Sequence, residues 1–215
     1  EDVGVTGEIH LTADPAFLLE PEEFSTDDLR AEGVELDRPL VGFSVREPGP
    51  AAPDIRPSEY YALLANAADY VVERYDTEIL FVPMEKTDVQ HSHAVVAGMR
   101  NAERAEILRR RYSARQILGL MGRLEFAIGM RLHFLIFAAL QGTPFIALPY
   151  ASKVIGLVED LDMPTPPLGA VGIGQLIARI DHSWDTRAAI QAKIRDRVPG
   201  LRARAGTTHD LLLAF

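Results

Sequence analysis

Short, continuously apolar runs alternate along this chain with longer segments of helical periodicity. A strand made from such a run has apolar residues on both faces, so it must be covered on both sides. Helices between successive parallel strands provide that cover. The pattern therefore predicts an α/β fold with a doubly wound parallel sheet. The expected strands are residues 40–45, 79–82, 106–110, 124–129 and 144–148.

Helical segments fill the intervals between these strands. Tyr61, Leu64 and Val72 recur at helical spacing in one of them. Ser58 and Ser113 stand where side-chain N-caps are expected. The expected helices are residues 58–75, 91–100, 113–121, 132–140, 175–184 and 186–197.

Composition narrows the classes of function. The 215 residues can bury a sizeable core, and the net charge of −9 argues against nucleic acid as the main partner. The basic run Arg109, Arg110 and Arg111 is expected to be a solvated surface. The absence of cysteine excludes disulfides and thiolate metal sites and is compatible with a cytoplasmic location. Arg131 and His133 interrupt the longest apolar stretch, so no membrane span is predicted.

Basic residues follow several expected strands at their carboxyl ends. Arg46 follows the first strand, Arg131 and His133 follow the fourth, and Lys153 follows the fifth. Ligands of parallel sheets bind at this edge, so these side chains are expected to converge. Arg131 and His133 also begin a helix, whose free N–H groups favour an anion. The sequence therefore predicts a site for phosphate and carboxylate groups, with His133 able to exchange a proton near neutral pH.

Plainer interpretations of the same residues stay open. An arginine or lysine after a strand is commonly a solvated loop charge, and a histidine on an apolar face is commonly a core residue. Only convergence of several cations on one edge separates a site from these alternatives, and convergence depends on the strand assignments.

Several blocks of sequence occur in the order typical of a known family. They are residues 12–19 (TADPAFLL), 42–46 (GFSVR), 81–84 (FVPM), 129–133 (GMRLH), 144–148 (PFIAL) and 150–153 (YASK). Through these blocks the chain resembles the polysaccharide pyruvyltransferase family over roughly residues 11–160. The GMRLH block followed by PFIA is the most specific part. The sequence departs from the family where Ala151 and Ser152 replace Asp-Pro before Lys153.

The family is similar in fold to two-domain GT-B glycosyltransferases, and this chain resembles their C-terminal half. The resemblance implies a Rossmann-like donor-binding domain at residues 36–185. Residues 1–35 would be the remnant of an interdomain connection, and residues 186–215 a C-terminal helical tail. The chain lacks an initial Met and the Gly-rich start of the N-terminal half, so it is expected to come from a longer protein.

The resemblance also implies a reaction. An enolpyruvyl group would pass from phosphoenolpyruvate to a sugar of a cell-surface polysaccharide precursor, forming a pyruvate ketal and releasing phosphate. Arg46 and Arg131 would bind the donor's two anions with help from Lys153, and His133 would be the general acid. No cofactor is expected. The implied partners are a sugar or lipid-linked glycan acceptor and a missing N-terminal domain, with the protein cytoplasmic or peripheral at the inner membrane face.

Further residues and functions are weaker candidates. Asp14 and Asp88 match the family, but Asp14 could be a turn residue and Asp88 a helix N-cap. His91 and His93 would point apart on a helix, so no metal site is expected. The alternative functions are the nucleotide-sugar-binding domain of a GT-B glycosyltransferase or epimerase, and a non-catalytic half that binds donor.

Overall fold

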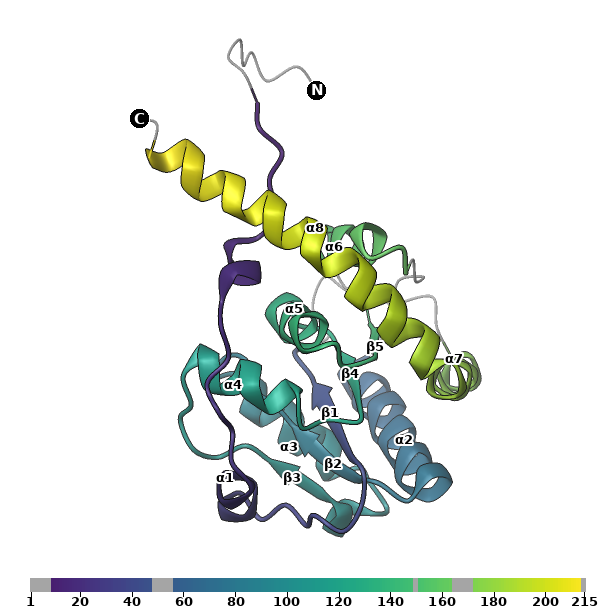
Figure 1. The fold of residues 1–215 in the computed structure, drawn as a ribbon. Coiled ribbons are helices and arrows are strands. Elements are labelled where there is room, and N and C mark those ends of the chain that lie inside the picture. Colours follow the sequence, from purple (N-terminus) through teal and green to yellow (C-terminus); the bar gives the residue numbers. More distant parts are fainter. Residues whose placement is uncertain (1–8, 48–55, 149–150, 164–171, 214–215) are drawn as a thin grey trace.

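The computed structural model describes residues 9–47, 56–148, 151–163 and 172–213. All five expected strands are present and form one parallel sheet in the order β3-β2-β1-β4-β5 (Figure 1). The predicted α/β fold with a doubly wound parallel sheet is therefore confirmed. The strands are β1 (Leu40–Ser44), β2 (Glu78–Phe81), β3 (Ala105–Ile107), β4 (Phe126–Gly129) and β5 (Phe145–Ala147).

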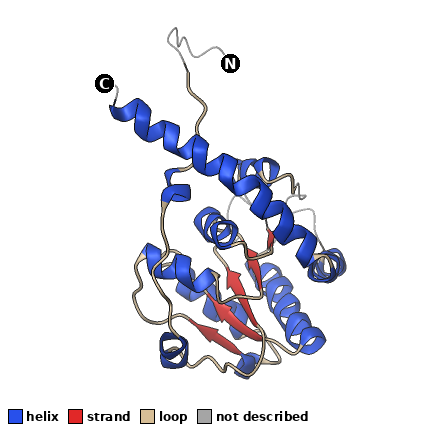
Figure 2. Cartoon of the chain, in the orientation of Figure 1, coloured by secondary structure: helices blue, strands red, loops and turns tan. Residues whose placement is uncertain are grey.

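Helices cover both faces of the sheet (Figure 2). One face carries η1 (Pro15–Leu18), α1 (Thr26–Ala31), α4 (Ala114–Met121), α5 (Leu132–Gln141), α6 (Ser152–Asp160) and α8 (Arg187–Leu213). The other face carries α2 (Pro57–Tyr75), α3 (Asp88–Val96) and α7 (Ile173–Asp185), and η3 (Ala102–Arg104) leads into β3. Among the described residues, no helix combines the length and apolar character that a membrane span needs.

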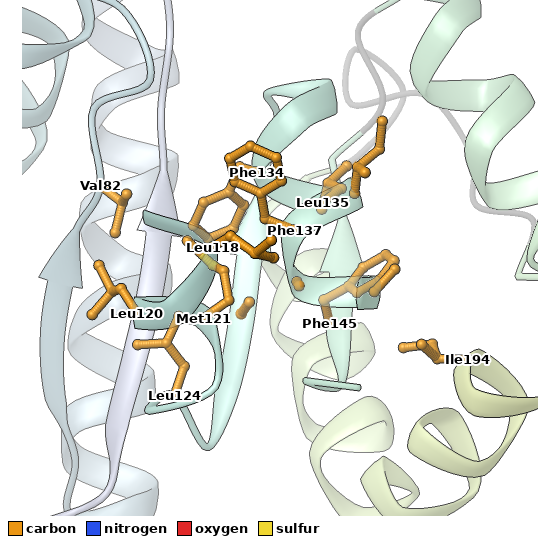
Figure 3. Close-up of a cluster of buried hydrophobic side chains, with 14 of the residues drawn as sticks. Val82, Leu118, Leu120, Met121, Leu124, Phe134, Leu135, Phe137, Phe145 and Ile194 are labelled. Carbon is orange, nitrogen blue, oxygen red and sulfur yellow. The ribbon is translucent and has the colours of Figure 1, made fainter. Parts of the chain in front are cut away.

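The apolar runs are explained by this double cover. In β4, Phe126 and Ile128 pack into the core on the α2 side, whereas Ala127 between them packs into the core on the α5 side. Figure 3 shows the α5-side core, where Phe134 and Phe145 lie among aliphatic side chains. Because both of its faces are buried, β4 has no place for alternating polar residues.

The strand order reverses between β1 and β4, and this reversal indicates where a ligand would bind. The chain leaves β1 for α2 on one face and leaves β4 for α5 on the other. At the end of the ladder Ser44 lies opposite Gly129. In open α/β sheets a crevice forms outside the carboxyl ends of the strands at such a reversal. The residues after β1 and β4 therefore border the expected binding crevice.

A glycine brings α5 close to the end of β4. A Cβ added to Gly129 would lie 2.3 Å from Cδ1 of Phe134, whose side chain is fully buried. Phe134 can therefore pack directly on the strand. This contact sets the first turn of α5, where Arg131 and His133 lie.

Some helix boundaries differ from those predicted. Helix α2 begins at Pro57 after Arg56, so Ser58 is inside the helix and the predicted Ser58 cap is wrong. Proline fits the first helical position because the N–H it lacks has no partner there. Helix α3 starts three residues before the predicted position 91 and ends at Val96. Ser113 caps α4 as predicted, accepting a hydrogen bond from the backbone N–H of Gln116 at 3.1 Å.

The last helix extends far beyond its predicted end at residue 197. It continues through Pro199 to Leu213, although a proline inside a helix removes a hydrogen bond. Four buried residues at spacings of four, three and four explain this continuation, because they pack α8 onto the α5-side core. They are Ile194, Val198, Leu201 and Ala205.

We predict that Gly129→Ala destabilises the protein by about 1–3 kcal/mol, because the new methyl group overlaps the ring of Phe134 and must displace α5. Urea unfolding measures the change. Gly156→Ala is the matched control, since Gly156 is inside α6 with no atom within 4 Å of an added Cβ. That substitution should stabilise by about 0.5–1 kcal/mol through helix propensity. Equal effects of the two substitutions would contradict the packing argument.

Candidate functional site

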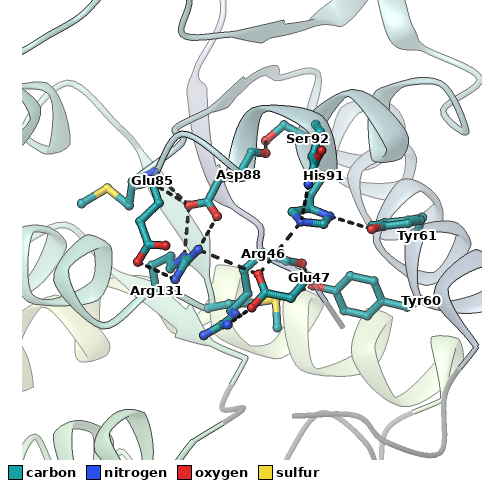
Figure 4. A network of polar contacts seen from close by, with 12 residues as sticks. Arg46, Glu47, Tyr60, Tyr61, Glu85, Asp88, His91, Ser92 and Arg131 are labelled. Carbon is teal, nitrogen blue, oxygen red and sulfur yellow. Dashed lines mark hydrogen bonds and ion pairs between the residues drawn. The ribbon is translucent and has the colours of Figure 1, made fainter. Parts of the chain in front are cut away.

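Arg131 occupies the N-cap position of α5, directly after β4, and its side chain is only 9% exposed. Its Nε and Nη2 donate to the two carboxylate oxygens of Asp88 at 3.0 and 2.5 Å. Its Nη1 donates to Oε1 of Glu85 at 2.9 Å (Figure 4). The guanidinium is therefore fixed by two hydrogen bonds on one side and held by a second carboxylate on the other.

Asp88 is fully buried and is the first residue of α3, so the predicted alternative of an N-cap is wrong. Its Oδ2 also accepts the backbone N–H groups of Met84 and Glu85, both at 3.1 Å. The carboxylate thus joins the loop after β2 to the end of β4. A buried guanidinium needs such a partner, since an unpaired buried charge is strongly destabilising.

Arg46 approaches Arg131 from the neighbouring strand. It follows β1, and its backbone carbonyl accepts the Tyr60 hydroxyl at 2.8 Å. Its guanidinium pairs with Glu47. The other oxygen of Glu47 lies 4.0 Å from Nη2 of Arg131 (Figure 4). The two arginines therefore meet around one carboxylate at the strand-order reversal, as the expected convergence required.

The sequence predicts a cationic edge at the carboxyl ends of the strands, and the structure corrects this prediction. Glu47, Glu85 and Asp88 surround the two arginines. The physical reason is compensation, because buried or half-buried guanidinium groups are tolerated only beside anions or other acceptors. Glu47 and Glu85 follow β1 and β2, and residues 83–88 were expected on this edge because they follow the second strand, but no local spacing showed that these carboxylates would face the arginines. Their side chains are 38% and 63% exposed, whereas that of Asp88 is inaccessible.

His91 also belongs to this network, a role that no sequence pattern indicated. Its Nδ1 lies 2.6 Å from the Tyr61 hydroxyl, and its Nε2 lies 4.0 Å from Oε2 of Glu47. Burial is the main cause of a lowered His91 pKa; nearby Asp88 opposes the shift, and Arg131 supports it. The ring is only 12% exposed. His91 therefore stays neutral at pH values at which an exposed histidine is already protonated.

His133 projects away from this network. Its side chain is 57% exposed, and its Nε2 lies 3.6 Å from Oδ2 of Asp14. Asp14 caps η1 by accepting the backbone N–H of Ala16 at 2.9 Å, so the turn interpretation is confirmed. The ring of His133 also lies over Phe137, with centroids 6.3 Å apart. His133 is thus an accessible side chain on the α5 side rather than a core histidine.

Lys153 is the second residue of α6, which follows the edge strand β5, and it is exposed. Within the described residues its ammonium group forms no ion pair with the carboxylates of the network. Tyr150, part of the same block, lies outside the described residues. The structure therefore places Lys153 on the predicted edge without joining it to Arg46, Arg131 or His133.

Ser44 is a site candidate that the sequence did not indicate. It ends β1, opposite Gly129, and is 1% exposed. Its Oγ has no hydrogen-bond partner among the described residues. A buried polar atom without a partner is costly, and this one lies at the strand-order reversal.

A cluster of carboxylates lies at the opposite edge of the sheet. Oxygens of Glu35, Asp37 and Glu78 lie within 4.8 Å of one another, which is compatible with holding a cation. Arg38 contacts all three at 3.2–3.3 Å, and Nε of Arg104 lies 2.6 Å from Glu78. Their charge is therefore already compensated by arginines.

The sequence model of the family described as polysaccharide pyruvyl transferase matches residues 1–152. No curated protein sequence matches the chain significantly.

Solved structures with a similar fold are glycosyltransferases and epimerases of the GT-B class. A glycosyltransferase from Rickettsia africae has a TM-score of 0.58 at 12% identity, with 93% of this chain and 54% of that chain covered. A UDP-GlcNAc 2-epimerase from Neisseria meningitidis, bound to UDP-GlcNAc, has a TM-score of 0.57 at 9% identity, covering 87% and 47%. ADP-heptose heptosyltransferase II from E. coli has a TM-score of 0.51 at 18% identity, covering 80% and 54%. The present chain thus spans about half the length of these proteins.

We predict that Asp88→Asn lowers the free energy of unfolding by about 3–5 kcal/mol, because it leaves the buried guanidinium of Arg131 without its anionic partner. Glu85→Gln is the matched control. It also removes a carboxylate that pairs with Arg131, but from an exposed position, and should cost about 1 kcal/mol or less. Guanidinium chloride unfolding of the three proteins measures both changes. Similar losses from the two substitutions would refute the distinction between a buried and an exposed partner.

The lowered pKa of His91 makes the stability of the protein depend on pH. Its folded pKa lies below the unfolded value of about 6.5, so the unfolded chain takes up a proton first as the pH falls. Stability linked to His91 is therefore complete above about pH 6.5 and is lost as the pH falls toward the lower, folded pKa. His91→Gln should remove this part of the pH dependence, measured as urea midpoints between about pH 5 and 7.5. An unchanged slope in the variant would contradict it.

Proposed function

Because the chain belongs to the polysaccharide pyruvyl transferase family, a family of transferases, we propose that it binds phosphoenolpyruvate for enolpyruvyl transfer to a sugar. The acceptor is a cell-surface polysaccharide precursor, and the products are a pyruvate ketal and phosphate. The observation that supports this most directly is the meeting of Arg46 and Arg131 at the strand-order reversal. Two guanidinium groups match a donor that carries a phosphate and a carboxylate.

The carboxylates around the arginines divide into two kinds. Asp88 is inaccessible and fixes Nε and Nη2 of Arg131, so it acts as a positioning residue. Glu47 and Glu85 are partly exposed and occupy directions from which an anionic ligand would approach. In the proposed complex the donor's anions take the place of these two carboxylates, which swing toward solvent. The hydroxyl of Ser44 lies at the same end of the sheet and can donate to an oxygen of the donor.

His133 is proposed as the general acid. It donates a proton to the donor's methylene carbon, and one sugar hydroxyl adds to the adjacent carbon. The bond from that carbon to the phosphate oxygen then breaks, and a second hydroxyl of the sugar adds in its place. Of the two hydroxyl protons released, one returns to His133 and the other leaves with the phosphate. His133 lies on the first turn of α5, two residues after Arg131, and it lines the same cavity as Glu85, which pairs with Arg131. This shared lining supports a donor that extends from Arg131 toward His133. Its exposure leaves it accessible to substrates, and the neighbouring Asp14 can orient the ring. Lys153 would approach from α6 to assist in holding the donor.

A second candidate function is nucleotide-sugar binding, which the likeness to GT-B glycosyltransferases and epimerases favours. A third is donor binding without turnover, because the chain spans about half the length of those proteins. Turnover by this chain alone separates the proposed transferase from a non-catalytic donor-binding half. It is measured as phosphate release from phosphoenolpyruvate, with a panel of sugars as acceptors.

The donor is tested by thermal unfolding. Phosphoenolpyruvate at a concentration of about 100 times its Kd should stabilise the native state by about 2.7 kcal/mol and raise Tm, whereas UDP-GlcNAc should not. A rise with UDP-GlcNAc alone would replace the proposed donor by a nucleotide sugar.

Two variants separate binding from proton transfer. Arg131→Lys keeps the positive charge beside Asp88 but loses the forked contact, so the Kd for phosphoenolpyruvate should rise about tenfold or more. His133→Ala removes a largely exposed side chain, so Tm and donor affinity should change little while phosphate release falls at least a hundredfold. Calorimetry and a phosphate assay measure these effects. Equal losses of donor affinity in both variants would contradict the assigned roles.

A further inference from the structure

A cavity of about 850 Å³ lies next to the proposed donor site. Its walls come from the loops that follow β2 and β3, from η1 and from α5. His133 and Glu85 are both part of its lining, so the cavity reaches the proposed general acid and the carboxylate that contacts Arg131. A molecule bound in this cavity would lie within reach of the reacting donor.

The cavity is strongly basic in a chain whose net charge is −9. Lys86, Arg109, Arg110 and Arg111 line it, against the single carboxylate of Glu85. Glu85 is itself paired with Arg131, and Arg109 pairs with Glu106 at 2.6 Å. Across the part of the chain that the structure describes, no ion pair involves Lys86, Arg110 or Arg111. The three arginines were expected to form a solvated surface; they are exposed, and they also line this cavity.

A buried carboxylate holds the arginine loop in place. Glu32, which is 1% exposed, accepts the backbone N–H groups of Arg109 at 2.7 Å and Arg110 at 3.2 Å. It also accepts the Tyr112 hydroxyl at 2.7 Å. The loop backbone is therefore fixed, while the side chains of Arg110 and Arg111 are exposed. A fixed loop loses less conformational entropy when a ligand binds to it.

The rest of the lining is apolar. Leu108, Ile117 and Phe137 contribute to it. A cavity that combines an aromatic and aliphatic wall with several cations suits a ring-shaped ligand that carries a negative charge. Forked guanidinium contacts favour phosphate, which offers several oxygens, over a one-atom anion such as chloride.

We propose that this cavity binds the acceptor as a phosphorylated sugar, with the phosphate held by Arg110, Arg111 and Lys86 and the sugar ring directed toward His133. The assignment rests on the proposed transferase function and adds the chemical class of its acceptor. Donor and acceptor then occupy adjacent sites. The donor anions lie at Arg46 and Arg131, and the acceptor phosphate lies at the loop after β3.

The test uses glucose 1-phosphate as the probe, with glucose as the uncharged control, in calorimetric and NMR titrations of the full 215-residue chain. Glucose 1-phosphate should bind, and glucose should bind at least tenfold more weakly. Saturating phosphoenolpyruvate should leave the Kd for glucose 1-phosphate the same or lower. Competition between the two ligands would indicate one shared site and overturn the proposal, as would an absence of glucose 1-phosphate binding up to tens of millimolar.

Paired variants locate the site. Arg110→Gln/Arg111→Gln removes two exposed arginines that form no ion pair within the described chain, so Tm should be preserved. The Kd for glucose 1-phosphate should rise about tenfold or more, while that for phosphoenolpyruvate should stay within about twofold. Arg123→Gln/Arg187→Gln removes the same charge beside Leu124 and Glu125, at the other edge of the sheet, and should leave both affinities unchanged.

The outcomes separate this inference from the proposed function. An unchanged glucose 1-phosphate affinity in the first double variant overturns the cavity assignment and leaves the donor proposal intact. Equal loss of both affinities there makes the cavity the donor site and also overturns it. If phosphoenolpyruvate fails to bind the wild-type protein, the proposed function fails, and the acceptor assignment that rests on it fails with it.

Discussion

The pairing of Arg131 with Asp88 is the interaction on which the ligand edge depends. A guanidinium at the end of a buried strand must meet an anion, and Asp88 meets it with both carboxylate oxygens. The same carboxylate accepts two backbone N–H groups of the loop after β2. One buried group therefore fixes the end of β4, the start of α3 and the loop between β2 and α3 relative to one another.

The three carboxylates around Arg131 differ in how far they are exposed to solvent. Asp88 is inaccessible, whereas Glu47 and Glu85 border solvent. The buried carboxylate orients the guanidinium of Arg131. The partly exposed carboxylates compensate its remaining charge, and a ligand anion can replace them at a low cost in free energy. This division lets a site be both fixed in geometry and open to an anionic ligand. It also explains why the proposed anion site contains three carboxylates beside its two arginines.

Two adjacent regions of the edge differ in character. The arginines at the strand-order reversal are enclosed and compensated, while the loop after β3 presents arginines from a backbone anchored by Glu32. His133 lies at the boundary, on the first turn of α5 and in the lining of the basic cavity. Gly129 makes this possible, because its missing side chain lets Phe134 and the start of α5 pack against β4.

The sequence by itself determined the fold class, because strands buried on both faces must be continuously apolar and that pattern is local. It also marked Arg46, Arg131 and His133, since residues that follow strands fall on one edge of a parallel sheet. Only the tertiary structure decided which charges meet. Asp88 and Arg131 are 43 residues apart, and Glu32 and Arg109 are 77 apart, so no local spacing joins them. The end of α8 was likewise decided by packing, which carries the helix past Pro199. The local sequence pattern sets the helices and strands. Contacts between residues distant in the sequence set the charge of the site, because an arginine is neutralised by whichever carboxylate lies near it in space.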